Sequence, residues 1–281
     1  MTEWKPNLIV VVGDVNSTLA AAITANKMGV RIAHLESGLR SFDREMPEEI
    51  NRILTDEITD VFFVTEQSGL DHLKAEGISD EKVFFVGNTM IDSLVLFKNQ
   101  IEASPIMEEL NVQTGKFAIM TMHRPSNVDT AQGLKILIEI ITTITYHVKL
   151  VFPIHPRTIG ALKKFGLMAD IENNAQLILT EPLDYFGFQN LVANSKFVVT
   201  DSGGIQEETT FLGVPCLTLR NNTERPITCT LGTNKLLEYS KDVVEPEIAA
   251  IMEGTYKKGT VPPLWDGDST LRILEILDRI V

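Results

Sequence analysis

The ten residues TDSGGIQEET, at positions 200–209, indicate how this chain folds and what it binds. An apolar run at 196–199, typical of a buried strand, precedes them, and a short helix is predicted to continue to Gly213. A strand that stops at Ser202 and restarts as a helix leaves free backbone N–H groups at the positive end of the helix dipole. An anion such as phosphate is stabilised there. Gly203 and Gly204 have no Cβ, so the backbone can approach that anion closely.

The predicted helix also carries acceptors for a sugar beside the phosphate. Gln206, Glu207 and Glu208 lie in its first turns, within reach of a neighbouring hydroxyl, and phosphate with vicinal hydroxyls indicates a nucleotide. A second interpretation needs no ligand, because Ser202 could be the N-cap of an ordinary helix that follows a strand. These ten residues alone do not separate the two.

Composition narrows the classes of protein to consider. The chain has 281 residues, 44% hydrophobic and 22% charged, as expected for a soluble protein of one or two domains. Its net charge of −13 disfavours nucleic acid and anionic membranes as partners. Two cysteines without metal-type spacing fit a reducing compartment. There is no signal-peptide pattern and no apolar run of membrane-spanning length, so we expect a cytoplasmic protein with no membrane partner.

Short apolar runs alternate with helical segments along the chain, a pattern typical of βαβ units and parallel sheets. The predicted strands are residues 8–12, 30–35, 61–64, 82–86, 117–121, 148–152, 176–179, 196–199 and 214–218. Residues 100–115 are polar, lack strand character and indicate a linker. We therefore predict an α/β fold with two Rossmann-like domains and a cleft between them. The predicted parts are a first domain at 1–99, the linker at 100–115, a second domain at 116–265 and a last helix at 266–281.

Three carboxylates in the first half are candidates for acid–base chemistry. Asp14 and Glu36 follow predicted strands, at the carboxyl ends where parallel sheets bind ligands, and Glu48 begins a predicted helix. Clustered carboxylates in a cleft have pKa values that differ from one another, as proton transfer requires. Taken singly, Asp14 and Glu48 could instead cap helices, and Glu36 could lie in a solvated loop.

Histidine and arginine follow two strands of the second half. His123 precedes Arg124, and His155 lies two residues before Arg157. Such side chains could bind diphosphate oxygens, although a lone histidine is more often structural. Arg225, in the sequence TERP at 223–226, could face the same cleft or form a surface ion pair of little energetic worth.

Laid out in order, these motifs resemble those of the non-hydrolysing UDP-N-acetylglucosamine 2-epimerases. The matching segments are GD at 13–14 with ST at 17–18, HLESGLR at 34–40, PEEINR at 47–52, GNTMID at 87–92, HR at 123–124, HP at 155–156, DSGGIQEE at 201–208, GVP at 213–215 and TERP at 223–226. Each segment is short, but together they cover nearly the whole chain in the family's order.

The resemblance implies a two-domain fold of the GT-B type, with the last helix crossing back to the first domain. It implies that the protein interconverts UDP-N-acetylglucosamine and UDP-N-acetylmannosamine: UDP leaves C1 as a proton leaves C2, and both return with the opposite configuration at C2. It further implies a homodimer without cofactor or metal that serves cell-envelope polysaccharide biosynthesis. The implied catalytic residues are Asp14, Glu36, Glu48 and His123; the implied UDP-binding residues are His155, Ser202, Gly203, Gly204, Glu207 and Arg225.

One departure from the family affects the expected activity. Family members begin with a strand and a Gly-Thr-Arg-Pro-Glu loop that supplies two cations to the active site, and this sequence has no such segment. We therefore expect an N-terminally truncated first domain and impaired catalysis. Two other functions stay open: a nucleotide-sugar binding protein that keeps the UDP site without turnover, and a GT-B glycosyltransferase, which would have an acceptor site and form no glycal.

Overall fold

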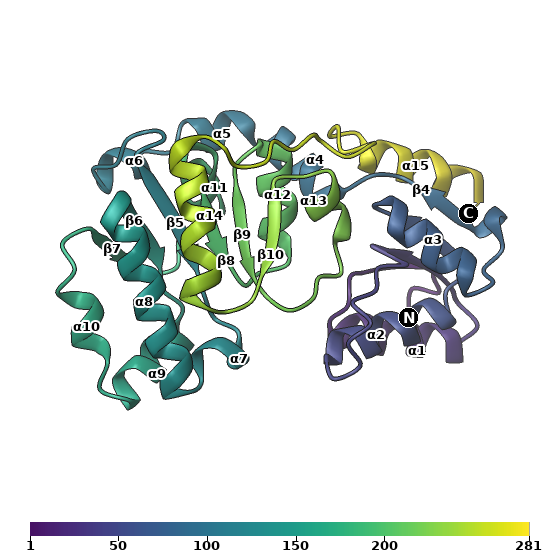
Figure 1. Ribbon diagram of the computed structural model, residues 1–281. Helices are drawn as coiled ribbons and strands as arrows, with labels where there is room; N and C mark the ends of the chain where they lie inside the picture. Colours follow the sequence, from purple (N-terminus) through teal and green to yellow (C-terminus); the bar gives the residue numbers. More distant parts are fainter. Residues whose placement is uncertain (281) are drawn as a thin grey trace. The chain divides into compact units, whose positions relative to one another are not determined.

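The computed structural model describes residues 1–280, which divide into two compact α/β units (Figure 1). Unit 1 comprises residues 1–96, 222–227 and the chain from 262 onward; unit 2 comprises residues 97–221 and 228–261. Each unit is built on one parallel sheet, which confirms the predicted α/β fold with two Rossmann-like domains.

Unit 1 contains a four-stranded sheet in the order β1-β2-β3-β4. Its strands are β1 (Leu8–Val12), β2 (Arg31–Leu35), β3 (Val61–Val64) and β4 (Val83–Phe85). Its helices are α1 (Asn16–Lys27), α2 (Pro47–Glu57), α3 (Gln67–Ala75), the 3₁₀ helix η1 (Asp80–Lys82), α4 (Thr89–Leu96) and α15 (Ser269–Ile280). Because side chains alternate along a strand, Ala33 and Phe63 pack against Ile273 of α15, while Phe62 packs on the other face with Leu73 of α3.

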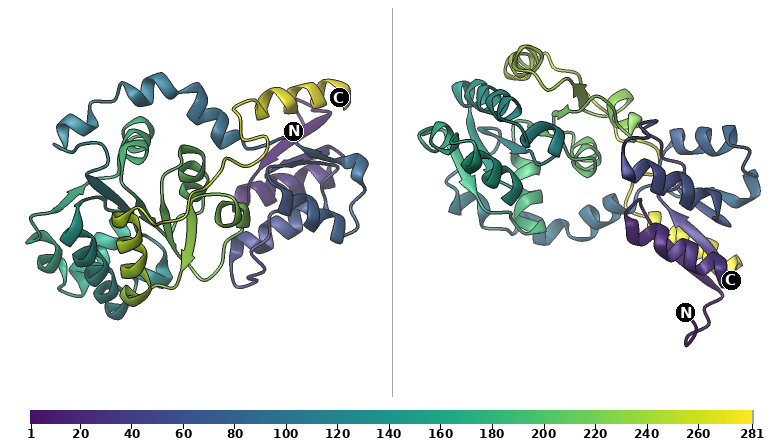
Figure 2. Two further views of the ribbon diagram at one scale, coloured as in Figure 1. Left: turned by 45° about the horizontal axis from the view of Figure 1, so that its top comes forward. Right: turned by 90° about the horizontal axis from the view of Figure 1, so that it is seen from below.

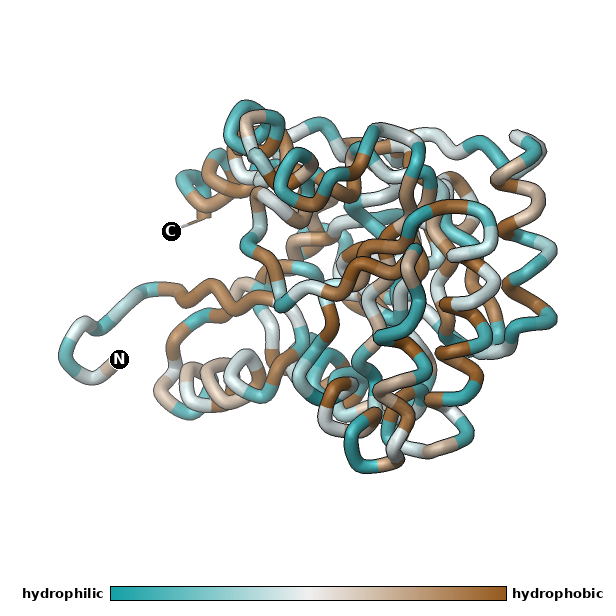
Figure 3. The backbone as a smooth tube through the Cα atoms, turned by 90° about the vertical axis from the view of Figure 1, so that its left-hand side faces the viewer, coloured by the Kyte–Doolittle hydropathy of each residue, from teal (hydrophilic) through white to brown (hydrophobic). Residues whose placement is uncertain are grey.

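Strand β1 is the edge of this sheet and is apolar throughout, as the brown stretch beside the N-terminus in Figure 3 shows. It pairs in parallel with β2 from Leu8–Arg31 to Val12–Leu35. Two of its side chains, Val10 and Val12, are 44% and 49% exposed. Exposed apolar edges are sites of strand-to-strand association.

We therefore expect Val10→Lys to reduce self-association of the chain. The exposed lysine costs little folding energy and places a charge on the edge. Light scattering across a concentration series should give a lower apparent mass for the variant. Val243→Lys is the matched control, because Val243 is a comparably exposed valine (36%) that lies on a helix. Equal effects of both variants would contradict a role for the edge.

Unit 2 contains a six-stranded parallel sheet in the order β10-β9-β8-β5-β6-β7. Its strands are β5 (Phe117–Thr121), β6 (Lys149–Pro153), β7 (Leu177–Thr180), β8 (Val198–Thr200), β9 (Cys216–Leu219) and β10 (Asn234–Leu237). From β5 the chain proceeds outward to β6 and β7, then returns to β8 on the other side of β5 and proceeds to β9 and β10. The direction of strand progression thus reverses between β5 and β8, where doubly wound sheets bind their ligands.

Helices cover both faces of this sheet (Figures 1 and 2). One face carries α8 (Ala131–His147), α9 (Pro156–Lys164), α10 (Met168–Glu172) and α14 (Lys241–Glu253); the other carries α5 (Lys98–Glu102), α6 (Ile106–Glu109), α11 (Tyr185–Asn194) and α12 (Gly204–Leu212). Two further short helices, α7 (Pro125–Val128) and α13 (Pro226–Thr230), follow loops. Within residues 1–280 no helix combines the length and the apolarity needed to cross a bilayer.

The structure differs from the sequence prediction at residues 100–115. This segment forms α5 and α6, and its apolar side chains Ile101, Ile106 and Val112 are buried. Ile106 and Val112 belong to the core of unit 2, and Asn190 of α11 donates to the carbonyl of Ile101. The segment is mostly polar because only a few positions face the core, which makes it resemble a linker in sequence.

Candidate active site

Asp14 and Glu36 lie beside each other in unit 1, just beyond the carboxyl ends of the paired strands β1 and β2. A Cβ added to Gly13 would lie 3.9 Å from Oε2 of Glu36, which shows how closely the two loops approach. Glu36 has a φ of 70°, rare for a residue other than glycine, and its N–H donates to the carbonyl of Phe63. Backbone strain of this kind concentrates at functional sites.

Each of these carboxylates faces an arginine. Nε of Arg52 donates to Oδ2 of Asp14 at 2.9 Å, and Nη2 of Arg225 lies 3.6 Å from Oε2 of Glu36. Burial raises the pKa of Glu36, against the opposing charge of Arg225, and the carboxylate of Asp14 raises it further. The site therefore holds a carboxylate fixed by an ion pair beside a carboxyl that binds a proton more readily than usual. Acid–base chemistry requires such a difference.

Glu36 also lines a cavity of about 550 Å³ within unit 1. The lining residues are Val12, Glu36, Thr89, Met90, Asp92, Ser93, Leu96, Gly267 and Thr270. Apolar side chains with a few hydroxyls and one reactive carboxyl are the usual composition of a small-molecule site. The carboxyl of Asp92 is already used to cap α15, where it accepts from the N–H groups of Ser269 and Thr270.

The structure does not bring Glu48 to the other two carboxylates. Glu48 is exposed in the first turn of α2, and among the described residues 1–280 its side chain forms no hydrogen bond or ion pair. Its neighbour Glu49 is buried: it accepts from the backbone of Ser41 and Phe42 and pairs with Arg52. Glu49 therefore holds the loop before α2, while the proposed role of Glu48 rests on the sequence.

In unit 2, His123 follows β5 and is paired with a buried aspartate that follows β8. The backbone N–H groups of His123 and Arg124 donate to Asp201, and Nδ1 of His123 lies 3.1 Å from Oδ1 of Asp201. Burial alone would raise the pKa of Asp201, but these hydrogen bonds hold it below its usual range. The aspartate thus orients the His123 ring, which is 44% exposed, so that Nε2 is its outward atom.

His155 lies beside His123, with ring centroids 5.6 Å apart. It is the N-cap of α9, where its Nδ1 accepts from the N–H of Arg157 at 3.1 Å. Because Nδ1 is the acceptor, Nε2 is left as the ring's N–H donor. Two imidazole rings with outward Nε2 atoms can donate hydrogen bonds to the oxygens of a bound anion.

Ser202, Gly203 and Gly204 open helix α12 at the reversal point of the unit 2 sheet. Gly203 is the N-cap, and no side chain caps this end of the helix. The alternative in which Ser202 is the cap is therefore wrong: the N–H of Ser202 donates to Oγ1 of Thr200 instead. An uncapped N-terminus with two glycines leaves the first backbone N–H groups available to an anion. Glu207 is in the first turn and is 3% exposed.

Arg225 belongs to unit 1 and lies in a buried cluster with Glu224 and Glu66, two acids for which the sequence pattern predicts no role. It pairs with Glu224 at 2.5 Å as well as with Glu36. Glu66, 1% exposed, is the N-cap residue of α3 and accepts hydrogen bonds from Ser68 and from the backbone of Ile227. Burial raises the pKa of Glu66 to about 7, against the hydrogen bond from Ser68 and the charge of Arg225.

This shift predicts that Glu66 destabilises unit 1 as the pH rises. Since its folded pKa of about 7 lies above the ordinary glutamate value of 4.5, the folded state alone holds the proton between these values. Stability should therefore fall across this window, by about 3 kcal/mol in total. Glu66→Gln should match the wild type below pH 4.5 and be up to about 3 kcal/mol more stable above pH 7.

Urea unfolding followed by tryptophan fluorescence measures this effect, because both tryptophans lie in unit 1 and Nε1 of Trp265 donates to the carbonyl of Thr65. Glu81→Gln is the control, since Glu81 is exposed. A Glu66→Gln variant less stable than the wild type at pH 8 would show that the carboxylate is the stabilising form.

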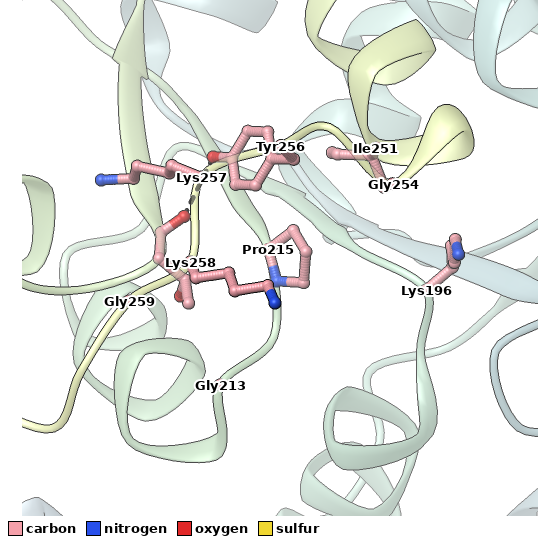
Figure 4. Close-up of a pocket in the computed structure, with 10 residues that line it drawn as sticks. Lys196, Gly213, Pro215, Ile251, Gly254, Tyr256, Lys257, Lys258 and Gly259 are labelled. Carbon is pink, nitrogen blue, oxygen red and sulfur yellow. Dashed lines mark hydrogen bonds between the residues drawn. The ribbon is translucent and has the colours of Figure 1, made fainter.

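A separate cavity of about 440 Å³ in unit 2 lies at the amino ends of its strands (Figure 4). Lys196, Lys257 and Lys258 line it, with Tyr256, whose hydroxyl donates to the carbonyl of Thr233. The candidate residues of unit 2 follow the carboxyl ends of β5, β6 and β8. This cavity therefore lies at the opposite ends of the strands from the candidate site. Within residues 1–280 no group of three or more histidines, cysteines or acids is arranged to hold a metal.

Known proteins resemble this chain in sequence and in fold. A UDP-N-acetylglucosamine 2-epimerase from Methanococcus maripaludis is 42% identical over 242 residues, 84% of this chain and 66% of that protein. A UDP-2,3-diacetamido-2,3-dideoxy-D-glucuronate 2-epimerase from Pseudomonas aeruginosa is 41% identical over 85% of this chain and 66% of its own length. The crystal structure of the Methanocaldococcus jannaschii UDP-GlcNAc 2-epimerase, in complex with UDP-GlcNAc and UDP, superimposes with a TM-score of 0.89 at 38% identity, covering 99% of this chain and 77% of that one.

The chain thus spans about two thirds of the length of the two curated relatives. A model of the family described as UDP-N-acetylglucosamine 2-epimerase matches residues 1–278. The chain belongs to the UDP-N-acetylglucosamine 2-epimerase family.

Proposed function

We propose that this protein is a non-hydrolysing 2-epimerase that interconverts UDP-N-acetylglucosamine and UDP-N-acetylmannosamine. The observation that carries the proposal is the pair Asp14 and Glu36, adjacent carboxyls of which one is ion-paired to Arg52 and the other has a raised pKa. Inversion at C2 requires a proton to leave one face of the carbon and arrive at the other. A carboxylate held by an ion pair beside a carboxyl with a raised pKa can perform these two transfers.

UDP departure requires stabilisation of the charge that develops on the diphosphate. The uncapped N-terminus of α12 supplies the backbone N–H groups of Gly203 and Gly204, and Ser202 supplies its hydroxyl, because its N–H already donates to Thr200. The outward Nε2 atoms of His123 and His155 supply further contacts. Glu207 is the proposed ribose acceptor, and Arg225 a further UDP-binding residue. The C1–O bond to UDP breaks as the C2–H bond breaks, which gives a glycal and UDP; both bonds re-form with inversion at C2. Glu48 completes the proposed catalytic set.

The setting of the reaction is also part of the proposal. The sequence pattern supports a cytoplasmic enzyme that uses no cofactor, and the family resemblance supports a homodimer that supplies an amino sugar for cell-envelope polysaccharide. The relative from Pseudomonas aeruginosa supports a second candidate substrate, a UDP-diacetamido-dideoxy-glucuronate, because its identity to this chain is nearly the same. The two candidates differ chemically at C3 and C6, so a direct comparison of rates separates them.

Incubation with each UDP-sugar in heavy water tests the proposal. An epimerase incorporates deuterium at C2 of both epimers without net release of UDP. Binding of UDP without deuterium exchange would indicate a nucleotide-sugar binding protein. Transfer of the sugar to an acceptor without exchange would indicate a glycosyltransferase. Exchange with the diacetamido-glucuronate alone would change the substrate and keep the reaction.

A further inference from the structure

His34 lies in β2, two residues before Glu36, and its side chain is completely buried. Its Nδ1 is 2.6 Å from Oδ1 of Asp56, and its Nε2 is 2.9 Å from the carbonyl oxygen of Gly13. Both ring nitrogens are therefore engaged, one with α2 and one with the turn that carries Asp14. The reaction as proposed above gives His34 no role.

The chemistry of the two partners decides where the protons are. A backbone carbonyl can only accept, so Nε2 must carry a hydrogen. Asp56 is ionised: its Oδ2 accepts from the N–H of Gly38 at 3.0 Å and lies 2.7 Å from Nη1 of Arg40. Burial alone would raise the pKa of Asp56, but His34 and Arg40 lower it below its usual value. Since Oδ1 is then also an acceptor, Nδ1 must carry a hydrogen as well.

We propose that His34 carries a hydrogen on both ring nitrogens, and that it thereby positions Asp14 and supplies positive charge to the catalytic carboxylates. The mechanical part follows from the turn after β1. Gly13, at φ 64°, donates its N–H to the carbonyl of Leu35 and accepts from Nε2 of His34 through its own carbonyl. Both the N–H and the carbonyl group of Gly13 are thus hydrogen-bonded to β2. Because Gly13 directly precedes Asp14, these bonds fix the separation of Asp14 from Glu36.

The second part of the proposal is the effect of the His34 charge on the pKa of Glu36, and it rests on the proposed catalytic function of Glu36. The charged groups that act on Glu36 are Arg225, Asp14, His34 and Arg52. Three of these are cations, and His34 is the one with no solvent exposure at all. Its counter-ion Asp56 is shared with Arg40, which in turn pairs with Glu76, so the charge of Asp56 is divided between two cations. Loss of the imidazolium charge should therefore raise the pKa of Glu36 further.

Nitrogen NMR of the protein labelled in its histidine rings tests the protonation state directly, without substrate. The chain has five histidines. The signals of the His34 ring are identified as those that are present in the wild type and absent in His34→Gln. At pH 7.5 these signals should show that both ring nitrogens carry hydrogen. A non-protonated ring nitrogen at His34 would overturn the proposal. If the variant does not fold, the wild-type spectrum still decides, because a protein in which no histidine has two protonated nitrogens at pH 7.5 contradicts it.

The charge is tested by carboxyl-carbon NMR of the glutamates, with the Glu36 signal assigned from Glu36→Gln. In His34→Gln the titration midpoint of Glu36 should move up by about one pH unit. His72→Gln is the matched control, because the ring of His72 also bonds a backbone carbonyl of unit 1, that of Gly38, and it should leave the midpoint unchanged. An unmoved Glu36 midpoint in His34→Gln would reduce His34 to a packing role. Failure of the exchange assay with both NMR results as expected would instead reject the proposed reaction.

Discussion

Glu36→Gln is expected to lower the rate of C2 hydrogen exchange by about 10²- to 10⁴-fold, the usual contribution of a positioned acid or base. Glutamine has nearly the same shape as glutamate and can keep a contact with Arg225, but its amide neither takes up nor delivers a proton. Apart from Arg225, whose contact the glutamine keeps, the proposed UDP contacts belong to α12 and to the loops after β5 and β6 of unit 2. The dissociation constant for UDP should therefore stay unchanged, so that the loss appears in turnover.

Two further glutamine variants make this result specific. Glu57→Gln is the matched control, because Glu57 is an exposed glutamate at the end of α2 and should retain full exchange. Glu48→Gln tests the remaining carboxylate: a loss as large as that of Glu36→Gln would support the role that the sequence motif assigns to Glu48. Retention of more than a tenth of the exchange rate by Glu36→Gln would contradict its assignment as a catalytic residue.

The strands of both sheets were predictable because buried parallel strands are continuous apolar runs. Strand β10 is the exception. Residues Asn234–Leu237 contain only two apolar side chains, and Asn234 is buried because its amide bonds Gln206 and accepts from Thr218. A strand held by a polar network between distant segments has no local apolar signal. Residues 100–115 also lack a local apolar signal, but for a different reason: their few buried side chains are spaced too widely to show a periodic pattern.

The site was predictable as far as it depends on strand ends. Asp14, Glu36, His123, His155 and Ser202 were placed by the rule that parallel sheets bind ligands at their carboxyl ends. The partners of these residues were not predictable in the same way, because each comes from a distant segment: Arg225 reaches Glu36, and Asp201 reaches His123. Asp201 was visible in the sequence as part of a motif, but its function as the acceptor that orients His123 follows only from the pairing of β5 with β8.

Asp201→Asn is expected to destabilise unit 2 by about 3–5 kcal/mol at pH 7, because it removes one member of a buried charged network. Asp201 is completely buried and accepts from the N–H groups of His123 and Arg124 and from Nδ2 of Asn127. An asparagine of the same size loses the charge and turns its own NH₂ group toward these donors. Since the folded pKa of Asp201 is lowered, its stabilising effect is present above its unfolded value, near 3.9, and is lost as the pH falls through the folded one.

The measurement can assign this loss to unit 2. Circular dichroism follows the unfolding of both units, whereas fluorescence reports unit 1 alone, because Trp4 and Trp265 both lie there. The urea midpoint by circular dichroism should fall far more in Asp201→Asn than in Asp184→Ala, which removes an ordinary N-cap that accepts from Gly187 and should cost about 1 kcal/mol. The penalty of Asp201→Asn should also shrink toward pH 3. A variant as stable as the wild type at pH 7 would mean that the His123–Asp201 pair is not what joins the ends of β5 and β8, and the orientation of the His123 ring would then need another cause.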